Sequence, residues 1–361
     1  MAEMPFIGGE KRILPMDTLY LITGATGHLG NTIIRMLLEQ GRRVRGLVLP
    51  SDITQAIEGL PIEVFHGDVC DKRSLEPFFK VDEPCEMIVI HTAGIVSITS
   101  RINPLIYQVN VQGTKNVTDM CVEKKVKKFI YISSVHAIPE KAHGETVRET
   151  DHFAAADVVG AYAKTKAEAT QYVLDQVRDY GLDAVIVQPS GIVGPQDYGN
   201  AHMTQMVKDY ISGKLTAGVR GGYDFVDVRD VAQGVLSAVE RGHKGQCYIL
   251  SNRYVSVRQL LDMLHKISGQ RKIRTILPLW FAKMTAPLAE IYYRLRKMPP
   301  LFTSYSLYTL VSNSKMSHTR ADKDLAYTTR DMYKTLSDTV AWQSAHKKTA
   351  PPRVRNTLKK A

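Results

Sequence analysis

Apolar residues in the first half of the chain gather in short runs separated by longer amphipathic stretches. The short runs are rich in Val, Ile and Leu and predict buried strands at 19–23, 44–49, 62–65, 87–91, 129–133 and 184–188. The longer stretches have the apolar spacing of helices and lie at 31–40, 104–122 and 161–180. Strands that alternate with helices form a parallel sheet covered on both faces. The chain is therefore predicted to be an α/β protein with a doubly wound parallel sheet.

The pattern changes after Pro189. Residues 191–224 are rich in Gly, Tyr and Met and show little periodicity, and helical patterns dominate from residue 251. Two short predicted strands, 225–228 and 248–250, flank a predicted helix at 229–241. We therefore expect a sheet domain of residues 16–190, to which residues 225–250 return, and a smaller, mainly helical lobe of residues 191–224 and 251–345. We expect residues 1–15 to be a flexible extension and residues 346–361 to be a disordered basic tail.

The composition is that of an ordinary globular protein. Of the 361 residues, 44% are hydrophobic and 23% are charged, which excludes a mostly disordered chain, a collagen-like repeat and a small disulfide-stapled scaffold. Lys and Arg number 47 against 36 Asp and Glu, and the net charge of +11 favours an anionic partner such as a phosphorylated cofactor. The four cysteines are far apart and form no CxxC motif, so we expect reduced thiols and a cytoplasmic location. We expect neither a signal peptide nor a membrane-spanning helix.

A glycine-rich sequence, TGATGHLG at 23–30, joins the first predicted strand to the first predicted helix. Gly24 permits a tight turn, Gly27 allows backbone amides to approach a pyrophosphate, and Gly30 lets the helix pack closely on the strand. The helix N-terminus adds free N–H groups and a partial positive charge. A glycine-rich turn without a ligand is the alternative. The position after the first strand of a parallel sheet favours a dinucleotide site.

The end of the second predicted strand bears on the choice between NAD and NADP. An acid there binds the ribose 2′-hydroxyl of NAD, and a cation accommodates the 2′-phosphate of NADP. Val48 and Leu49 supply neither, and we interpret Asp52, beyond a proline, as a loop or cap residue. The missing acid narrowly favours NADP(H) over NAD(H). Hydroxyl and basic side chains nearby in sequence support this preference: Ser51, Arg42, Arg43 and Arg45.

Tyr162 and Lys166 lie four residues apart on the predicted helix 161–180 and therefore share one face. An ammonium one turn from a phenol stabilises the phenolate and lowers its pKa from about 10. The tyrosine can then exchange a proton with a carbonyl or carbinol oxygen. A lysine that remains solvated on the helix surface is the alternative.

The same Y-x-x-x-K spacing occurs twice more, at Tyr210/Lys214 and Tyr293/Lys297. Only the pair at 162 and 166 lies on a helix that follows a parallel strand ending in hydroxyls, Ser133-Ser134. A serine at that strand end can donate a hydrogen bond to the oxygen that the tyrosine protonates. The context therefore selects one of the three matches.

Several further motifs give the chain a clear resemblance to the extended short-chain dehydrogenase/reductase superfamily, which includes the NAD-dependent epimerases and dehydratases. The resemblance covers about residues 17–345 and is greatest to the dihydroflavonol-reductase and 3β-hydroxysteroid-dehydrogenase-like branch. It rests on these pieces: TGATGHLG at 23–30, GDV at 67–69, HTAG at 91–94, NVQGT at 110–114, YISS at 131–134, YAKTK at 162–166, QPSGIVGP at 188–195 and FVDVRDVA at 225–232. The resemblance implies a Rossmann-type sheet, a dinucleotide cofactor and helix-mediated homodimers.

The resemblance also implies roles for particular residues. Tyr162 would be the acid/base, Lys166 would tune its pKa and hold the nicotinamide ribose, and Ser134 would polarise the substrate oxygen. Asn110 is a weaker candidate that can equally brace a helix. Asp68 would accept from adenine or cap a turn. The implied cofactor contacts are Gly24, Thr26, Gly27, His28, Leu29, Gly30, Asp68, Val69, Ala93, Gly94, Tyr162, Lys166, Pro189 and Ile192.

The chain departs from the family pattern in two places. Val48-Leu49 stand where the family has an acid or an arginine, and LAYTT at 325–329 replaces the usual L-G-Y-x-P. The first departure bears on the choice of cofactor, and we interpret the second as a local structural change.

We therefore expect an NAD(P)-dependent oxidoreductase that acts on a carbonyl or secondary alcohol of a small, apolar or ring-containing molecule. A sugar-nucleotide epimerase or dehydratase with tightly bound NAD and a non-catalytic nucleotide sensor remain as alternatives. Neither a metal nor a nucleic-acid partner is expected. Residues that can face a substrate are Val96, Ile98, His136, His143, Tyr198, Met203, Met206, Tyr223 and Phe225; those that can serve a nucleotide diphosphate are Lys214, Arg220 and Arg229.

Overall fold

The computed structural model describes residues 17–97, 103–285 and 304–346. The predicted extension of residues 1–15, residues 347–361 of the predicted tail, Ile98 and the Tyr293/Lys297 pair lie outside the described residues. Within the described ranges, no helix is both long enough and apolar enough to cross a bilayer.

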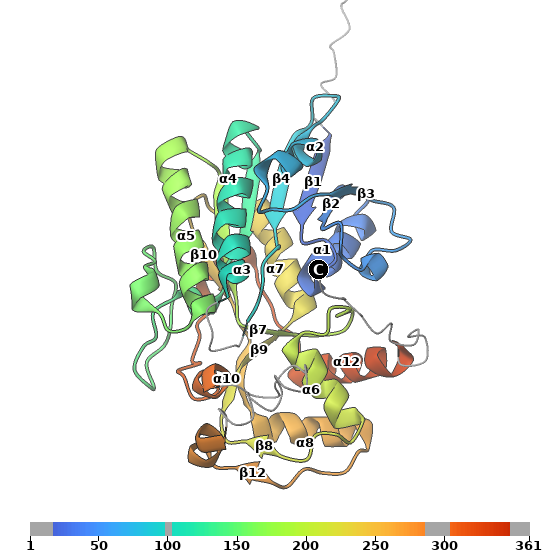
Figure 1. Cartoon of the computed structure of the whole chain (residues 1–361), viewed down its shortest axis with the longest axis vertical. Helices are drawn as coiled ribbons and strands as arrows, with labels where there is room; N and C mark the ends of the chain where they lie inside the picture. Colours follow the sequence, from blue (N-terminus) through green and yellow to red (C-terminus); the bar gives the residue numbers. More distant parts are fainter. Residues whose placement is uncertain (1–16, 98–102, 286–303, 347–361) are drawn as a thin grey trace, which may run out of the picture.

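A seven-stranded sheet forms the centre of the larger part of the molecule (Figure 1). All of its neighbouring strands are parallel, in the order β10-β6-β5-β4-β1-β2-β3. The strands are β1 (Thr18–Thr23), β2 (Arg43–Val48), β3 (Glu63–His66), β4 (Glu86–His91), β5 (Lys128–Ile132), β6 (Ala184–Pro189) and β10 (Cys247–Leu250). The predicted doubly wound parallel sheet is confirmed, with each predicted strand of the first half in place.

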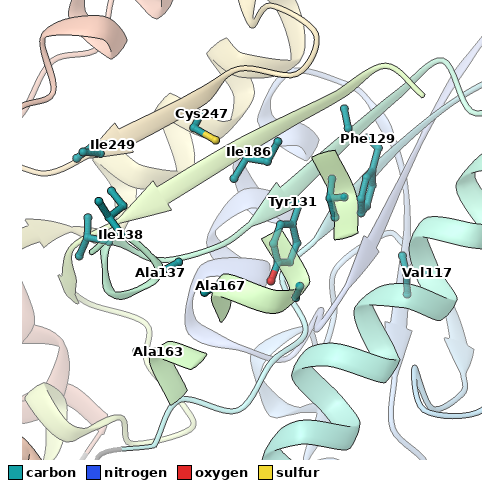
Figure 2. Packing of buried hydrophobic residues seen from close by; sticks show 14 of the residues in the cluster. Val117, Phe129, Tyr131, Ala137, Ile138, Ala163, Ala167, Ile186, Cys247 and Ile249 are labelled. Atoms are coloured by element: carbon teal, nitrogen blue, oxygen red, sulfur yellow. The ribbon is translucent and has the colours of Figure 1, made fainter. Parts of the chain in front are cut away.

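Helices cover both faces of this sheet. On one face, α1 (His28–Glu39) and α7 (Val228–Arg241) pack on apolar residues of the strands, such as Ile22 and Ile90. On the other face, α4 (Thr114–Glu123) and α5 (Ala161–Tyr180) cover a second apolar layer. Figure 2 shows this second layer, with Tyr131 of β5 on the side of Ala167 of α5. The carboxyl ends of all seven strands therefore meet at one open edge.

The remaining helical elements connect the strands or follow the sheet domain. The short ones are η1 (Thr54–Ala56), η2 (Lys72–Leu75), α2 (Glu76–Phe79), α3 (Pro104–Tyr107), the π-helical η3 (Gln108–Gly113), η4 (Val135–Ala137) and η5 (Ala155–Asp157). Those beyond β6 are α6 (His202–Ile211), α8 (Val257–Ser268), α10 (Ser304–Thr309), α11 (Thr319–Leu325) and α12 (Met332–His346). Residues 279–285 are also helical.

Two small sheets lie beyond the main sheet, within the mainly helical second part of the molecule. One contains β7 (Gly191–Val193), β9 (Gly222–Asp227) and β11 (Arg253–Ser256), and the other contains β8 (Gly218–Val219) and β12 (Ile276–Leu277). The strand predicted at 225–228 belongs to β9 and not to the main sheet, because it pairs with β7 and β11. Among the described strands after β6, only β10 joins the main sheet, while α7 covers one of its faces.

Two helix predictions were inaccurate. The first helix begins at His28 and not at residue 31, so it starts directly at the glycine loop. The helix predicted at 104–122 is continuous in the chain but contains the π-helical η3 in its middle. Such insertions are often found at functional sites, and this one carries Asn110.

A buried carboxylate anchors α7 to the last helix. The Asp227 side chain is inaccessible and accepts hydrogen bonds from the backbone N–H and the guanidinium of Arg229. Arg229 also donates to Asp338 of α12 at 2.8 Å. Arg229, which the sequence offered as a ligand for a nucleotide diphosphate, is therefore committed to these two carboxylates.

Candidate active site

The glycine loop folds back against the end of β4. Gly24 has a left-handed φ of +69°, and a Cβ there would lie 2.7 Å from the backbone nitrogen of Ala93. A Cβ on Gly30 would lie 2.2 Å from the Gly24 carbonyl oxygen. Gly27 differs, because its Cβ would meet only that same oxygen, at 3.1 Å. Gly24 and Gly30 are thus needed for the fold of the loop, while Gly27 keeps the loop's outer side open.

The loop leads directly into the N-terminus of α1. Gly27 is the N-cap, and within the described chain α1 has neither a side-chain cap nor an acidic residue in its first turn. The first N–H groups of α1 are therefore available to an anion, and they fit the pyrophosphate of a dinucleotide. Leu29 is buried beneath the loop. His28 Nε2 lies 2.8 Å from the carbonyl oxygen of Pro195, which ties the loop to the segment after β7.

The adenosine end of this site differs from the prediction. Arg43 pairs with Asp17 and Arg45 pairs with Glu63, so the charges of both are committed. Arg42 and Arg43 also lie at the start of β2, at the opposite end from the glycine loop. Asp52, interpreted from sequence as a loop or cap residue, instead accepts a hydrogen bond from Thr26 Oγ1 at 2.8 Å. A carboxylate thus lies beside the glycine loop, near the carboxyl end of β2.

The other predicted cofactor contacts come from neighbouring strand ends. Asp68 caps its own turn by accepting from the Cys70 N–H at 2.9 Å, and Val69 packs against Gly113 of η3. Ala93 and Gly94 follow β4, Pro189 ends β6, and Ile192 lies in β7. All of these residues belong to strands or loops at the carboxyl edge of the sheet, where the fold places ligands.

The two serines after β5 have different partners. Ser133 Oγ lies 2.6 Å from the hydroxyl of Thr170, in a buried contact with α5. Ser134 accepts from the His136 N–H at 3.2 Å, and its hydrogen bond to Tyr162 lowers the pKa of that phenol. The structure therefore places Ser134 beside Tyr162 and commits Ser133 to α5.

Tyr162 lies in the first turn of α5 and is only 7% exposed. Burial raises its pKa to about 12, and the hydrogen bond from Ser134 lowers it only in part. The phenol is therefore protonated near neutral pH and is suited to donate a proton to a carbonyl oxygen. The sequence predicted that Lys166 lowers the pKa of Tyr162, but Lys166 is not among the groups that shift this pKa.

Lys166 is 5% exposed, and burial lowers its pKa to about 7. Its ammonium donates to the Ile132 carbonyl oxygen at 2.7 Å and lies 5.0 Å from the centre of the Tyr131 ring. Among the described residues no carboxylate offsets this effect of burial on the Lys166 pKa. A Cβ on Gly94 would lie 3.5 Å from its Nζ, so the ammonium faces the loop after β4.

Asn110 braces this same loop. Its Oδ1 accepts from the Ile95 N–H at 2.8 Å, and its Nδ2 donates to the Ile95 carbonyl oxygen at 3.0 Å and to Thr165 at 3.2 Å. The residue therefore connects the loop after β4 to α5, next to Lys166. This is the bracing role that the sequence left open beside a catalytic one.

Aromatic side chains surround Tyr162. His136 contacts Tyr162 edge-on at 6.0 Å between ring centres and stacks on Tyr223. Tyr305 of α10 lies near the same histidine, and no motif in the sequence singled it out. Tyr198, by contrast, is half-buried and packs edge-on against Trp342 of α12.

The fully buried His91 and the half-buried His136 predict a loss of stability in acid. Burial lowers the pKa of His91 to about 3 and that of His136 to about 4. Between about pH 6.5 and about pH 4 the unfolded chain takes up protons that the native state does not, so the free energy of unfolding falls as pH falls. Each histidine adds up to about 1.4 kcal/mol per pH unit to this slope.

Urea unfolding across that pH range measures the slope. We expect His91→Gln to reduce it by about one proton, while His143→Gln, at an exposed position, leaves it unchanged. A His91→Gln slope equal to that of the wild type would contradict this account.

Metal ligands are not gathered anywhere in the described ranges, where no group of three His, Cys, Asp or Glu side chains is placed to hold an ion. The four cysteines are free thiols, and Cys121 and Cys247 are buried.

Known proteins resemble this chain over nearly its whole length. The model of the NAD dependent epimerase/dehydratase family matches residues 20–251. Sterol demethylase protein B of Methylococcus capsulatus is 30% identical, and the match covers 89% of this chain and 97% of that protein. A putative dihydroflavonol 4-reductase of Synechocystis is 29% identical, with 92% and 96% covered. The mouse 3 beta-hydroxysteroid dehydrogenase type 7 is also 29% identical, with 86% and 90% covered.

Solved structures show the same fold. The crystal structure of gox2253 has a TM-score of 0.78 and 33% identity, and the match covers 91% of this chain and 98% of that one. UDP-glucose 4-epimerase from Thermotoga maritima has a TM-score of 0.74 over 91% of this chain and 99% of that one, at 22% identity, so that likeness shows the fold alone. With the glycine loop, the strand order and the family match in agreement, this chain belongs to the NAD dependent epimerase/dehydratase family, within the extended short-chain dehydrogenases/reductases.

Proposed function

We propose that this enzyme transfers a hydride between a nicotinamide cofactor and a carbonyl or secondary alcohol carbon of a small, ring-containing molecule, with Tyr162 as the general acid/base. The observation that carries the proposal is the contact of Ser134 with the buried phenol of Tyr162, at the sheet edge where the glycine loop opens. Relatives aligned over most of the chain are named as a reductase and a dehydrogenase, which supports the same chemistry.

In this proposal the chain holds the cofactor and handles the proton. Gly24, Gly27 and the N-terminus of α1 would receive the pyrophosphate, and Lys166 would hold the nicotinamide ribose. The bound cofactor supplies or accepts the hydride at nicotinamide C4. During reduction, Tyr162 donates its proton to the substrate oxygen as the carbon receives the hydride, and Ser134 donates a hydrogen bond to that oxygen.

The Lys166 ammonium stabilises the phenolate that remains after proton transfer. Its charge is held within one helical turn of Tyr162 by the carbonyl oxygen of Ile132, which cannot neutralise it. Burial keeps water away from both groups, so their electrostatic interaction is stronger than at the surface. In the reduction, solvent must return a proton to the phenolate before Tyr162 can donate again.

The epimerase or dehydratase alternative requires a tightly bound NAD and a sugar nucleotide. Arg229 was a candidate ligand for that substrate, and it is instead paired with Asp227 and Asp338. The solved epimerases share the fold at 17–22% identity and support no further conclusion. A sensor without catalysis has no need of the buried Ser134 and Tyr162 pair. Both alternatives are therefore less well supported than hydride transfer.

Titration of the purified protein with NADPH and with NADH, followed by nucleotide fluorescence, tests the cofactor part of the proposal. A panel of ketones and steroids under the preferred cofactor then tests the reaction. Net oxidation of the nucleotide with a ketone supports hydride transfer. Copurified NAD that does not exchange, together with redox-neutral turnover of a UDP-sugar or GDP-sugar, would favour the epimerase alternative.

The preference for NADP(H) remains a prediction, and two structural observations now oppose it. Arg43 and Arg45 are committed elsewhere, and the Asp52 carboxylate lies at the glycine loop. A carboxylate near the adenosine ribose repels a 2′-phosphate. We therefore expect Asp52→Asn to improve the Kd of NADPH relative to that of NADH by about tenfold.

Fluorescence titration of both nucleotides gives this ratio without any substrate. Asp179→Asn, at an exposed position on α5, is the matched control and should leave the ratio unchanged. An unchanged ratio in Asp52→Asn would show that this carboxylate does not face the ribose.

The homodimer and the cytoplasmic location expected from the sequence also remain predictions. Light scattering of the purified chain tests the first, and cell fractionation tests the second.

A further inference from the structure

The aromatic side chains around the catalytic phenol come from three separate parts of the chain. His136 follows β5, Tyr223 lies in β9, and Tyr305 lies in α10. Tyr223 stacks on His136 at 5.6 Å and 11°, and its hydroxyl is 3.0 Å from His136 Nε2. The Tyr305 ring lies 6.3 Å from that of His136, which itself contacts Tyr162. We call His136, Tyr223 and Tyr305 the aromatic wall.

Tyr305 is fixed against the start of the catalytic helix. Gly160, just before α5, has a φ of +100°, and a Cβ there would lie 2.2 Å from the Tyr305 ring. The Tyr305 ring thus fills the space beside Gly160, two residues before Tyr162. A glycine at this point allows both the backbone conformation and the close approach of the ring.

The short helix that carries Tyr305 is fastened to the loop after β5. Tyr308 stacks on Tyr305 at 6.3 Å, and its hydroxyl donates to Glu140. Glu140 also accepts from the Asn313 N–H at 2.9 Å. The segment is therefore tied to the same strand-to-helix connection that carries Ser134 and His136. Figure 1 shows α10 beside the ends of β7 and β9, away from the outer helices of the sheet.

The Tyr305 hydroxyl has no structural partner. Tyr305 is 9% exposed, and its hydroxyl makes no hydrogen bond to any described residue. The hydroxyls of Tyr223 and Tyr308, by contrast, are paired. A buried hydroxyl without a partner destabilises the native state. A polar atom of this kind beside a catalytic group is typical of one whose partner is a ligand.

We propose that the Tyr305 hydroxyl binds a second oxygen of the substrate, whose ring lies against the aromatic wall. This inference rests on the proposed function, in which Ser134 and Tyr162 occupy the two lone pairs of the reacting oxygen. The Tyr305 hydroxyl is then left for another hydroxyl or carbonyl on the same molecule. The flat faces of the wall suit a fused or aromatic ring. The substrate class is therefore an oxygenated cyclic ketone or the corresponding secondary alcohol.

Two phenylalanine variants test this assignment in the enzyme loaded with its reduced nucleotide. Tyr305→Phe removes only the hydroxyl and keeps the ring. Tyr327→Phe is the matched control, because its hydroxyl is also buried without a described partner but lies in the apolar layer beneath α7. The probes are α-tetralone and its ring-hydroxylated derivatives, whose binding is followed by nucleotide fluorescence.

We expect Tyr305→Phe to weaken binding of a hydroxylated tetralone about tenfold, with no change for α-tetralone or for the nucleotide. Both variants should melt at or above the wild-type temperature, because each loses an unpaired buried hydroxyl. Tyr327→Phe should bind every probe as the wild type does.

The outcomes separate this inference from the proposed function. Equal affinity of wild type and Tyr305→Phe for all tetralones would overturn the role of Tyr305 and leave hydride transfer intact. If the wild type binds the hydroxylated tetralone more tightly than Tyr305→Phe does, but the nucleotide is not oxidised, the role of Tyr305 is supported. The proposed hydride transfer is then contradicted. A wild-type holoenzyme that binds none of the cyclic ketones would overturn the inference directly.

Discussion

Tyr162→Phe should lower kcat about a thousandfold while the Kd of the nicotinamide nucleotide stays within about twofold of the wild type. The phenylalanine keeps the ring that fills the first turn of α5, so the fold and the glycine loop are preserved. Only the proton donor and the hydrogen-bond partner of Ser134 are lost. Stopped-flow measurement of nucleotide oxidation with a ketone gives kcat, and fluorescence titration gives the Kd.

Tyr180→Phe is the control for this variant. Tyr180 ends the same helix and is 67% exposed, so its hydroxyl has no role in the site. We expect its kinetics to match the wild type. A Tyr162→Phe enzyme that retains most of its turnover would remove the assignment of this residue as the acid/base.

Alanine substitutions at Gly30 and Gly27 should have different effects: the first should lower stability, and the second should weaken nucleotide binding. In Gly30→Ala the new methyl group would lie 2.2 Å from the Gly24 carbonyl oxygen, which is backbone and cannot turn away. The helix must shift from the loop, and we expect a loss of about 3 kcal/mol in the free energy of unfolding. Urea unfolding measures this loss, and an unchanged midpoint would refute the packing argument.

Gly27→Ala provides the contrast. The Gly27 backbone is exposed and has a φ of −68°, which alanine readily adopts, and only the Gly24 carbonyl oxygen, at 3.1 Å, is close to the added methyl group. We expect a wild-type unfolding midpoint but at least about tenfold weaker nucleotide binding, because the methyl group obstructs the approach of the pyrophosphate. Wild-type affinity in Gly27→Ala would mean that the phosphates do not approach this glycine.

Much of the sheet domain could be predicted because local pattern and tertiary structure agree there. Strands such as β1 and β6 are buried on both faces and read as continuous apolar runs, and α5 has the same limits in the sequence analysis and in the structure. The second part was harder, because β8 and β12 are two-residue strands that are defined by their pairing and not by their composition.

The candidate site divides in the same way. Gly24, Ser134 and Tyr162 belong to motifs with fixed spacing, so the sequence could place them on one edge of the sheet. The contact of Asp52 with Thr26 could not be predicted, because it depends on the path of the loop after β2. Tyr305 lies more than a hundred residues from Tyr162 in sequence, and tertiary contacts, such as the packing of its ring beside Gly160, bring it there.

The fate of the nicotinamide hydrogen tests the central claim most directly. The enzyme is given reduced nucleotide deuterated at C4 of the nicotinamide, on the face that it uses, together with a cyclic ketone. We predict an alcohol with deuterium on its carbinol carbon and one oxidised nucleotide for each product molecule. A product without the label, or turnover that leaves the nucleotide pool unchanged, would contradict hydride transfer as the reaction of this enzyme.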